Sequence, residues 1–436
     1  MSRTHRHLAL GVSIGALALS LVIAGQASAA GFYIQEQSVK GLGRAYSGES
    51  ADTGAESLWW NPAAIGEVQG VEIYGGLNGI FSDTKVTDNG STITRPFQAT
   101  APVGGQPSAA NPLLTGVVPN LDVAWRLNDH IALGLAVSSP FDFTTKYDAS
   151  SFARYQALTS KLLDIDVQPT VALHVNRYLD LGVGLDAQYS KSTLSSALPN
   201  LSPLLPDGYN VLQGDGWDYG WTIGAQLHPN DRLSLGVSYR SQIDHTLNGT
   251  ATVGGLLGPL AGNNGALNAN AKYTTPWIVV LGGRYALDDH WTVNAQIQQV
   301  GWSEFKAITV TTLAGVTPIP QGYHDTTTEA VGADYKVNAL WTLRAGVAYD
   351  PTPTPNVGRS ARVPDGDRWL LTTGATVHPT SHLELDGAVA YIHLKSSPLT
   401  SVTPDYYGTP VVTPIAYQAG VTGDAVIVSV GGKYHF

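Results

Sequence analysis

The sequence contains no cysteine and only one methionine in 436 residues. The absence of cysteine excludes a disulfide framework and any site where thiolates bind zinc or an iron–sulfur cluster. Basic residues number 24 against 34 acidic ones, and this acidic balance argues against nucleic acid as a partner. After residue 29 no apolar run reaches the roughly 20 residues that a transmembrane helix needs.

The sequence is instead rich in glycine and aromatic residues, with 48 Gly, 20 Tyr and 10 Trp but only 13% charged residues. Its first 29 residues predict a signal peptide, because Arg3 and Arg6 precede an apolar core that ends in the cleavage site Ala27-Ser28-Ala29. In an exported protein, aromatic-rich alternating segments favour a closed β-barrel that crosses the outer membrane.

A hairpin pattern repeats along the chain, with short polar turns on one side and much longer connections on the other. The turns lie at 128–129, 176–177, 228–231, 288–289, 338–339 and 378–381. The longer connections lie at 139–164, 194–214, 246–273, 306–326, 350–366 and 395–423. These six hairpins and the strands predicted at 71–78 and 424–436 make fourteen strands. The even count places both chain ends with the short turns, which face the periplasm in outer-membrane barrels.

Alternation within the strands is regular, as in residues 179–190, where one face is apolar and the other polar. A soluble β-sandwich also alternates, but its strands average about 5–6 residues, against about 9–11 in a membrane barrel. Most strands here fit the longer range, and aromatic residues such as Trp291 and Tyr391 mark their ends. We therefore predict an all-β fold, a fourteen-stranded antiparallel transmembrane β-barrel formed by residues 67–436.

Residues 30–66 precede the first strand and lack its alternation. A barrel of this width is not filled by its own inward side chains, and irregular backbone is tolerated at membrane depth only where protein surrounds it. We therefore predict that residues 30–66 form a hatch inside the lumen. Within it, Asn61-Pro62-Ala63 is expected to make a rigid corner, with both halves of the Asn61 amide bonding backbone groups.

Three short motifs carry a family resemblance: "AGF" at 30–32, "GLGRAYSGE" at 41–49 and "NPA" at 61–63. Together they resemble the start of the long-chain fatty acid outer-membrane transporters, a family that includes monoaromatic-hydrocarbon channels. The similarity extends over most of the chain, for example through "GDGWDYGWTIGAQL" at 214–227 and "WSEFKA" at 302–307. The resemblance implies a hatch, capture of a hydrophobic ligand at the outer side, a lumenal pocket, and sideways exit at a kinked third strand.

This expectation points to specific residues. The hatch residues singled out are Phe32, Arg44, Asn61, Pro62 and Ala63. The lateral opening is expected at Ser139 and Pro140, since proline cannot donate to a strand ladder. The simpler interpretation, which we favour from sequence alone, is that Pro140 only ends the third strand.

Apolar residues also occur in segments that should face solvent. Phe152, Tyr155, Leu158 and Leu162 recur at helical spacing in the connection after the third strand. The next connection carries Leu201 and Leu205. These side chains are expected either to form a capture groove for a ligand or to pack together as a lid.

Charged residues with inward strand parity are expected to pair with each other or with the hatch. They are Arg240, Arg284, Lys336, Arg344, Arg368, Asp180, Asp186, Asp218, Asp334 and Asp386. Arg344 is the exception we single out as a lumenal partner for a ligand carboxylate, because its guanidinium offers a fork of donors near mid-height of the wall. Arg44 is a second candidate. Whether the ligand is a fatty acid or an uncharged hydrocarbon stays open.

No catalytic or metal-binding motif emerges from the sequence. The one G-x-S-x-G match, at 11–15, falls in the signal peptide, and the histidines lack paired metal spacing. Those at predicted turns are interpreted as solvated: His130, His228, His290, His378 and His382. The sequence therefore predicts no enzyme, no cofactor and no metal, and nothing in it selects a Ser–His pair for the enzymatic rival, an outer-membrane lipase.

The sequence thus predicts a multi-pass protein of the bacterial outer membrane that takes up long-chain fatty acids or similar hydrophobic compounds passively. The alternatives are a monoaromatic-hydrocarbon channel and a structural or adhesive barrel, while a general hydrophilic pore conflicts with a sealing hatch. The expected partners are hydrophobic small molecules, outer-membrane lipid and lipopolysaccharide, and the barrel-assembly machinery, with no nucleic acid. The protein is expected to act as a monomer.

Overall fold

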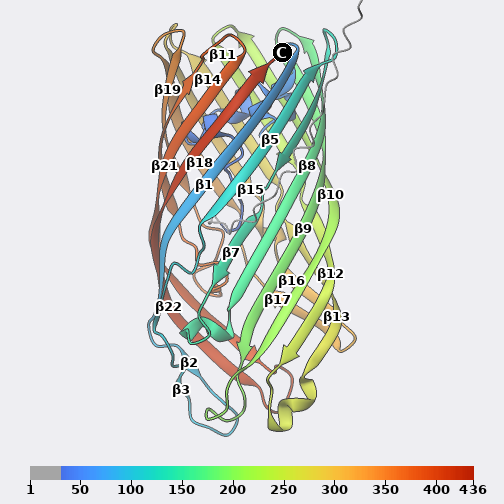
Figure 1. Cartoon of the computed structure of the whole chain (residues 1–436), viewed down its shortest axis with the longest axis vertical. Helices are drawn as coiled ribbons and strands as arrows, with labels where there is room; N and C mark the ends of the chain where they lie inside the picture. Colours follow the sequence, from blue (N-terminus) through green and yellow to red (C-terminus); the bar gives the residue numbers. More distant parts are fainter. Residues whose placement is uncertain (1–30) are drawn as a thin grey trace, which may run out of the picture.

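The computed structural model describes residues 31–436, so the predicted signal peptide, residues 1–29, lies outside the described residues. The described chain forms one antiparallel sheet that closes on itself (Figure 1). Its fourteen wall strands are β1 (Val71–Asp88), β5 (Gly116–Arg126), β6 (Ile131–Ser138), β8 (Thr159–Asn176), β9 (Leu179–Leu198), β10 (Gly208–Asn230), β11 (Leu233–Arg240), β14 (Ile278–Ala286), β15 (Trp291–Val300), β18 (Thr326–Lys336), β19 (Trp341–Asp350), β20 (Arg368–Val377), β21 (Leu383–Asp405) and β22 (Thr413–His435). Strand β1 pairs with β5 on one side and β22 on the other, which closes the barrel and confirms the predicted fold class.

The remaining elements are short or extend the wall strands. The further strands are β2 (Thr92–Ile93), β3 (Ala101–Pro102), β4 (Ser108–Ala110), β7 (Asp142–Lys146), β12 (Ile243–Gly254), β13 (Gly265–Thr275), β16 (Ala307–Thr312) and β17 (Gly315–Pro320). The helical turns are α1 (Val39–Leu42), η1 (Glu49–Ala51), η2 (Ala55–Ser57), η3 (Pro62–Ile65), η4 (Phe152–Tyr155), η5 (Gly258–Asn263) and η6 (Trp302–Glu304). None of these described helices has the length and apolar character needed to span a membrane.

The two ends of the barrel differ. Figure 1 places the C-terminus and the short turns at one end, drawn uppermost, and β2, β3 and the helical turn η5 at the other. We call these the periplasmic and extracellular ends, because short turns face the periplasm in barrels of this kind. The wall between them has an apolar outer face: in β9, Val183 and Leu185 are about half exposed, whereas Asp180 and Asp186 are fully buried.

Several segments predicted as long loops are strands. Strand β9 continues to Leu198, β10 starts at Gly208, and much of the connections at 246–273 and 395–423 belongs to β12, β13, β21 and β22. The sequence prediction was wrong here because a strand that projects beyond the lipid no longer needs an apolar outer face. In β22, for example, Ile415 and Tyr417 are buried on the inner face and Gln418 is exposed on the outer one. The helical spacing from Phe152 to Leu162 was also misleading: η4 covers four residues, and Leu162 lies in β8.

Residues 31–66, which we call the inner segment, lie inside the barrel, where Figure 1 shows them in blue within its periplasmic half. All of them are buried except Thr53, which is half-buried. Two wall glycines permit this close contact. A Cβ atom at Gly236 would lie 1.9 Å from the Ser50 carbonyl oxygen, and one at Gly346 would lie 2.3 Å from the Arg44 carbonyl carbon. Any larger residue at these positions would push the inner segment away from the wall.

Candidate functional site: the hatch and the interrupted third strand

The third wall strand is interrupted at Pro140. Strand β6 ends at Ser138 and β7 begins at Asp142, yet both pair with β8. Residues 139–141 therefore bulge out of the ladder, opposite residues 164–165 of β8. The simpler sequence interpretation was wrong, because Pro140 interrupts this strand rather than ending it.

On its other side the third strand separates from β5. The β5–β6 ladder stops at the pair Leu121–Val137, although β5 itself continues back to Gly116 against β1. Among residues 31–436, no ladder joins residues 116–120 to the third strand, and contact resumes only at the isolated bridge between Leu113 and Thr145. The wall therefore has a local gap in its hydrogen bonding beside the interruption.

The start of the inner segment lies along this interruption. The Ile34 amide donates to the Pro140 carbonyl at 2.8 Å, and the Asp142 amide donates to the Phe32 carbonyl at 3.0 Å. These bonds flank an antiparallel bridge between Tyr33 and Phe141. Because unpaired backbone groups are costly at membrane depth, residues 32–34 act as a short strand that satisfies the broken edge from inside.

The Phe32 side chain fills an aromatic cluster in the lumen. Its ring lies 4.8 Å from Trp302 and 5.1 Å from Phe305, measured between ring centroids. The other members of this aromatic cluster are Phe141, Phe143 and Tyr323. Edge-to-face packing of this kind makes an apolar environment in the lumen, occupied here by the protein's own phenylalanine.

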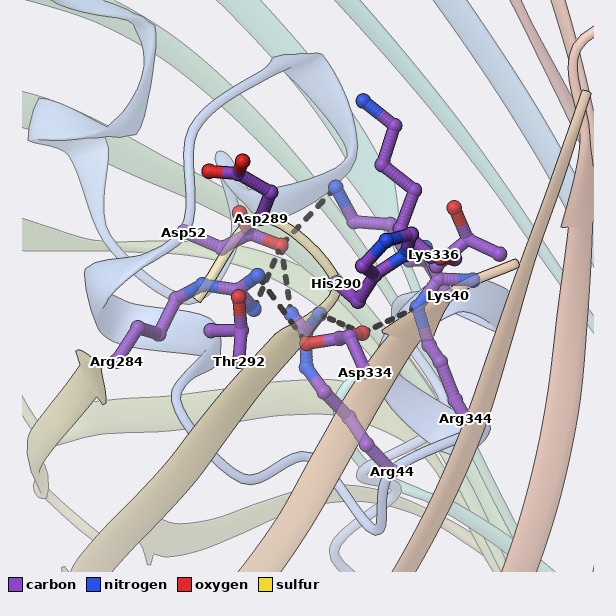
Figure 2. Close-up of a pocket in the computed structure, with 11 residues that line it drawn as sticks. Lys40, Arg44, Asp52, Arg284, Asp289, His290, Thr292, Asp334, Lys336 and Arg344 are labelled. Carbon is purple, nitrogen blue, oxygen red and sulfur yellow. Dashed lines mark hydrogen bonds and ion pairs between the residues drawn. The ribbon is translucent and has the colours of Figure 1, made fainter. Parts of the chain in front are cut away.

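An ion-pair network ties the inner segment to the wall nearer the periplasmic end (Figure 2). The Arg44 guanidinium is fully buried and contacts Asp52 at 2.6 Å and Asp334 at 3.3 Å. Arg284 bonds the same two carboxylates, and the network lines a cavity of about 210 Å³. Burial alone would raise the pKa of the Asp52 carboxyl, but Arg284, with Lys40 and Arg44, holds it well below its usual range. The Asp52 carboxylate is therefore ionised, and it links the hatch to the wall.

The predicted inward ion pairs are confirmed for four arginines, and they decide how Arg344 is placed. The pairs are Arg240–Asp186, Arg284–Asp334, Arg344–Asp334 and Arg368–Asp350. Lys336 is exposed, and Asp180 and Asp218 contact histidines instead. The Nε atom of Arg344 donates to Asp334 at 2.7 Å, so a ligand carboxylate would have to displace this partner. Its role as the lumenal carboxylate partner stays a prediction.

The Asn61 corner has the bonding that the sequence predicts. Its side-chain oxygen accepts from the Ala63 amide at 2.9 Å, and its side-chain nitrogen donates to the Ser50 carbonyl at 2.6 Å and the Ala225 carbonyl at 3.1 Å. Pro62 begins the turn η3 that follows. Asn61 thus joins two parts of the inner segment and the wall at one fully buried amide.

The apolar residues of the extracellular connections do not share one environment. Phe152 and Tyr155 are buried in a cluster with Tyr147, Leu399 and other loop residues. Leu158 is half-buried, and Leu162 is buried with the lumenal core. Leu201 is half-buried in a second loop cluster, and Leu205 is 40% exposed. Phe152 and Tyr155 therefore pack within the loops, and Leu205 lies at their solvent-facing edge. Whether the loops form a capture groove or a lid stays a prediction.

A residue that the sequence reasoning missed is Arg362, in the connection between β19 and β20. Its Nη1 donates to the Ser160 hydroxyl at 3.0 Å and the Ser195 carbonyl at 3.3 Å. Within the described chain no carboxylate lies within 4.0 Å of it, and burial lowers the pKa of its guanidinium to about 10. The next residue, Val363, packs against the core that contains Phe32. Strand parity could not find Arg362, because it lies in a loop that folds into the lumen.

Glu36 gives the inner segment a pH dependence. Burial raises the pKa of its carboxyl to about 7, against the opposing attraction of Arg368 and helped by Asp350. A carboxyl whose pKa is raised by folding favours the folded state at low pH and loses that advantage as pH rises from about 4.5 to about 7. The full shift corresponds to roughly 3 kcal/mol at about 1.4 kcal/mol per unit.

We therefore expect Glu36→Gln to tighten the inner segment at pH 8 and to change it little at pH 5. The measurement is the rate of limited proteolysis within residues 31–66 in detergent at both pH values. Equal protection by the substitution at both pH values would contradict the assignment to Glu36. Glu329→Gln, at an exposed position of the wall, serves as the matched control.

A closed barrel with an apolar outer face and a buried inner segment is the architecture of an outer-membrane transport protein. A family model described as outer membrane protein transport protein (OMPP1/FadL/TodX) matches residues 20–436. The chain belongs to this family and is a protein of the bacterial outer membrane.

Relatives in this family are similar along most of their length. The chain is 28% identical over 414 residues to the long-chain fatty acid transport protein of Escherichia coli O6:H1, covering 87% of this chain and 90% of that protein. It is 29% identical over 409 residues to outer membrane protein P1 of Haemophilus influenzae, covering 85% and 88%.

Solved structures agree with this assignment. A FadL homologue from Pseudomonas aeruginosa superposes with a TM-score of 0.81 at 25% identity, covering 93% of this chain and 100% of that one. The toluene transporter TbuX of Ralstonia pickettii gives a TM-score of 0.65 at 19% identity, covering 92% and 98%, and shows the shared fold.

Proposed function

We propose that this protein takes up long-chain fatty acids or similar hydrophobic molecules passively, with residues 30–66 as the hatch and residues 67–436 as the barrel. The observation that carries the proposal is the position of residues 32–34. The same short segment fills the aromatic cluster with Phe32 and covers the interruption at Pro140. One movement of this segment would therefore empty a lumenal pocket and open the wall beside it.

The proposed route starts at the extracellular lid. A hydrophobic molecule is captured at the solvent-facing edge near Leu205 and Leu201 and passes the lid residues Phe152 and Tyr155 into the aromatic cluster. It then leaves sideways at Ser139 and Pro140, where the third strand and β5 are not hydrogen bonded. Sideways exit suits an apolar cargo, because it enters lipid without crossing water.

Arg362 supports a ligand with a carboxylate. Its guanidinium contacts neutral oxygens of the described chain, and a half-buried cation without a counter-charge favours binding of an anion. Because Val363 packs against the core around Phe32, a chain held at Arg362 by its carboxylate would extend its tail toward the aromatic cluster. The similarity to the long-chain fatty acid transport protein of E. coli over most of its length supports this choice.

Arg362→Met tests this choice of ligand. Hydrogen bonds to charged groups contribute about 1.5–3 kcal/mol, so we expect uptake of a fatty acid below saturation to fall roughly 10- to 100-fold. Uptake of an uncharged hydrocarbon should change little, because its contacts are apolar. The measurement is uptake of radiolabelled oleate and of toluene by cells expressing each variant. Arg177→Met, at an exposed periplasmic turn, is the control.

A monoaromatic-hydrocarbon channel is the second candidate, favoured by the aromatic rings that surround Phe32. It predicts that Arg362→Met leaves oleate and toluene uptake equally unaffected. Mass spectrometry of molecules that co-purify with the detergent-extracted protein gives an independent answer. Fatty acids in the extract of the intact protein that are depleted from Arg362→Met would favour the first candidate over the second.

A further inference from the structure

Two histidines and two carboxylates meet at the periplasmic end of the wall, away from the aromatic cluster. They are Glu67, His174, Asp180 and His228. His174 lies near the end of β8, Asp180 near the start of β9 and His228 near the end of β10, while Glu67 directly follows the hatch. Strand pairing explains the meeting, because Asp180 stands opposite His174 on one side and Gln226 on the other.

The distances suit a metal ion. The donor atoms of Glu67, His174 and Asp180 all lie within 4.8 Å of one another, and His174 Nδ1 is 2.8 Å from Asp180 Oδ1. His228 Nε2 lies 3.2 Å from the other oxygen, Asp180 Oδ2. Tetrahedral zinc with bonds of about 2.0–2.1 Å holds its ligand atoms about 3.3 Å apart. The three donors of Glu67, His174 and Asp180 are therefore close to this spacing, and His228 reaches the group through Asp180.

The donor atoms at the centre contact one another. Asp180 is fully buried, and its two carboxylate oxygens face the two imidazoles, His174 Nδ1 at 2.8 Å and His228 Nε2 at 3.2 Å. A metal ion bound here would take these atoms as ligands in place of their contacts with one another. The other ring nitrogen of His228 is held by the Ser234 hydroxyl at 3.1 Å, which is the supporting contact that orients a metal-binding imidazole.

We propose that Glu67, His174, Asp180 and His228 form a binding site for a divalent transition metal such as Zn²⁺. Two imidazoles with two carboxylates are a donor set that zinc accepts, whereas Ca²⁺ and Mg²⁺ prefer oxygen alone. The site goes beyond transport and departs from the sequence prediction of no metal. Metal bound there would fix the exit of the hatch, through Glu67, to the wall strands β8, β9 and β10. The chain already passes close to the site, because a Cβ atom at Gly66 would lie 2.4 Å from Asp180 Oδ1.

The test uses the intact mature protein in detergent, carrying an affinity tag without histidine and stripped of metal with a chelator. Titration calorimetry with Zn²⁺ alone, together with elemental analysis, should give saturable binding of one ion per chain. His174→Asn and His228→Asn should each weaken binding at least about ten-fold. His382→Asn, at another periplasmic turn, is the matched control and should bind as the intact protein does.

Glu67→Gln keeps the test decisive if a wall substitution disturbs assembly, because Glu67 is exposed and outside the strands. Zn²⁺ should slow hydrogen exchange of the backbone at residues 66–70 in the intact protein, and Glu67→Gln should reduce both this protection and the affinity. Absence of saturable binding would overturn the proposal. It would also be overturned by equal affinity in all variants, or by equal loss in His382→Asn.

Discussion

Removal of residues 32–60 is expected to open the lumen to water. Gln296 of β15 faces the hatch, and its side-chain oxygen accepts from the Ser50 amide at 3.1 Å. Because the chain has no native cysteine, Gln296→Cys gives a single thiol to report on this contact. In the shortened chain it should react with a membrane-impermeant maleimide roughly 100-fold faster, because in the full chain the thiol is reached only through a local opening; a 100-fold difference corresponds to about 2.7 kcal/mol.

The shortened chain should still fold, because the wall closes through β1 and β22 without any hatch residue. Heat-modifiable migration on a gel checks this before labelling. Proteoliposomes with the shortened chain should also swell in small sugars that the full chain excludes. If the thiol reacts as slowly in the shortened chain as in the full one, residues 32–60 do not seal the lumen and the hatch assignment fails.

The wall could be predicted from sequence because the membrane requires apolar side chains on its outer face, which gives each strand a regular pattern. A strand between lipid and lumen must alternate, and the short turns carry Asn, Asp and Pro, so all fourteen wall strands were expected. Beyond the lipid the outer face no longer has to be apolar, which is why the ends of β9, β21 and β22 were predicted as loops. Pro140 was ambiguous for a related reason: proline reports a missing donor but not whether the strand resumes after it.

The site was harder to predict because its residues meet only through the closed fold. Asn61 could be singled out from its local motif, since its partners include Ser50 and Ala63 nearby in the chain. Arg362 could not, because a loop residue has no parity and its partners Ser160 and Ser195 lie in distant strands. His228 was interpreted as a solvated turn residue, although strand register places it beside the buried Asp180.

A covalent link between the hatch and the interrupted strand should stop uptake. Tyr33 and Phe141 face each other in an antiparallel bridge, and the amide bonds on either side of it make them a non-hydrogen-bonded pair. Such pairs have Cα atoms about 4.5 Å apart, within the range that a disulfide spans. The double variant Tyr33→Cys and Phe141→Cys should therefore form a disulfide in the oxidising periplasm, with no native thiol to compete.

The oxidised double variant is expected to transport oleate no faster than cells without the protein, because residues 32–34 can no longer leave the gap or the aromatic cluster. The double variant after reduction with dithiothreitol loses the same two rings without the link, and each single variant loses one of them. These are the matched controls. Uptake should return on reduction to the level set by these controls. Undiminished uptake in the fully oxidised variant would mean that cargo leaves elsewhere, since a linked segment cannot uncover Pro140.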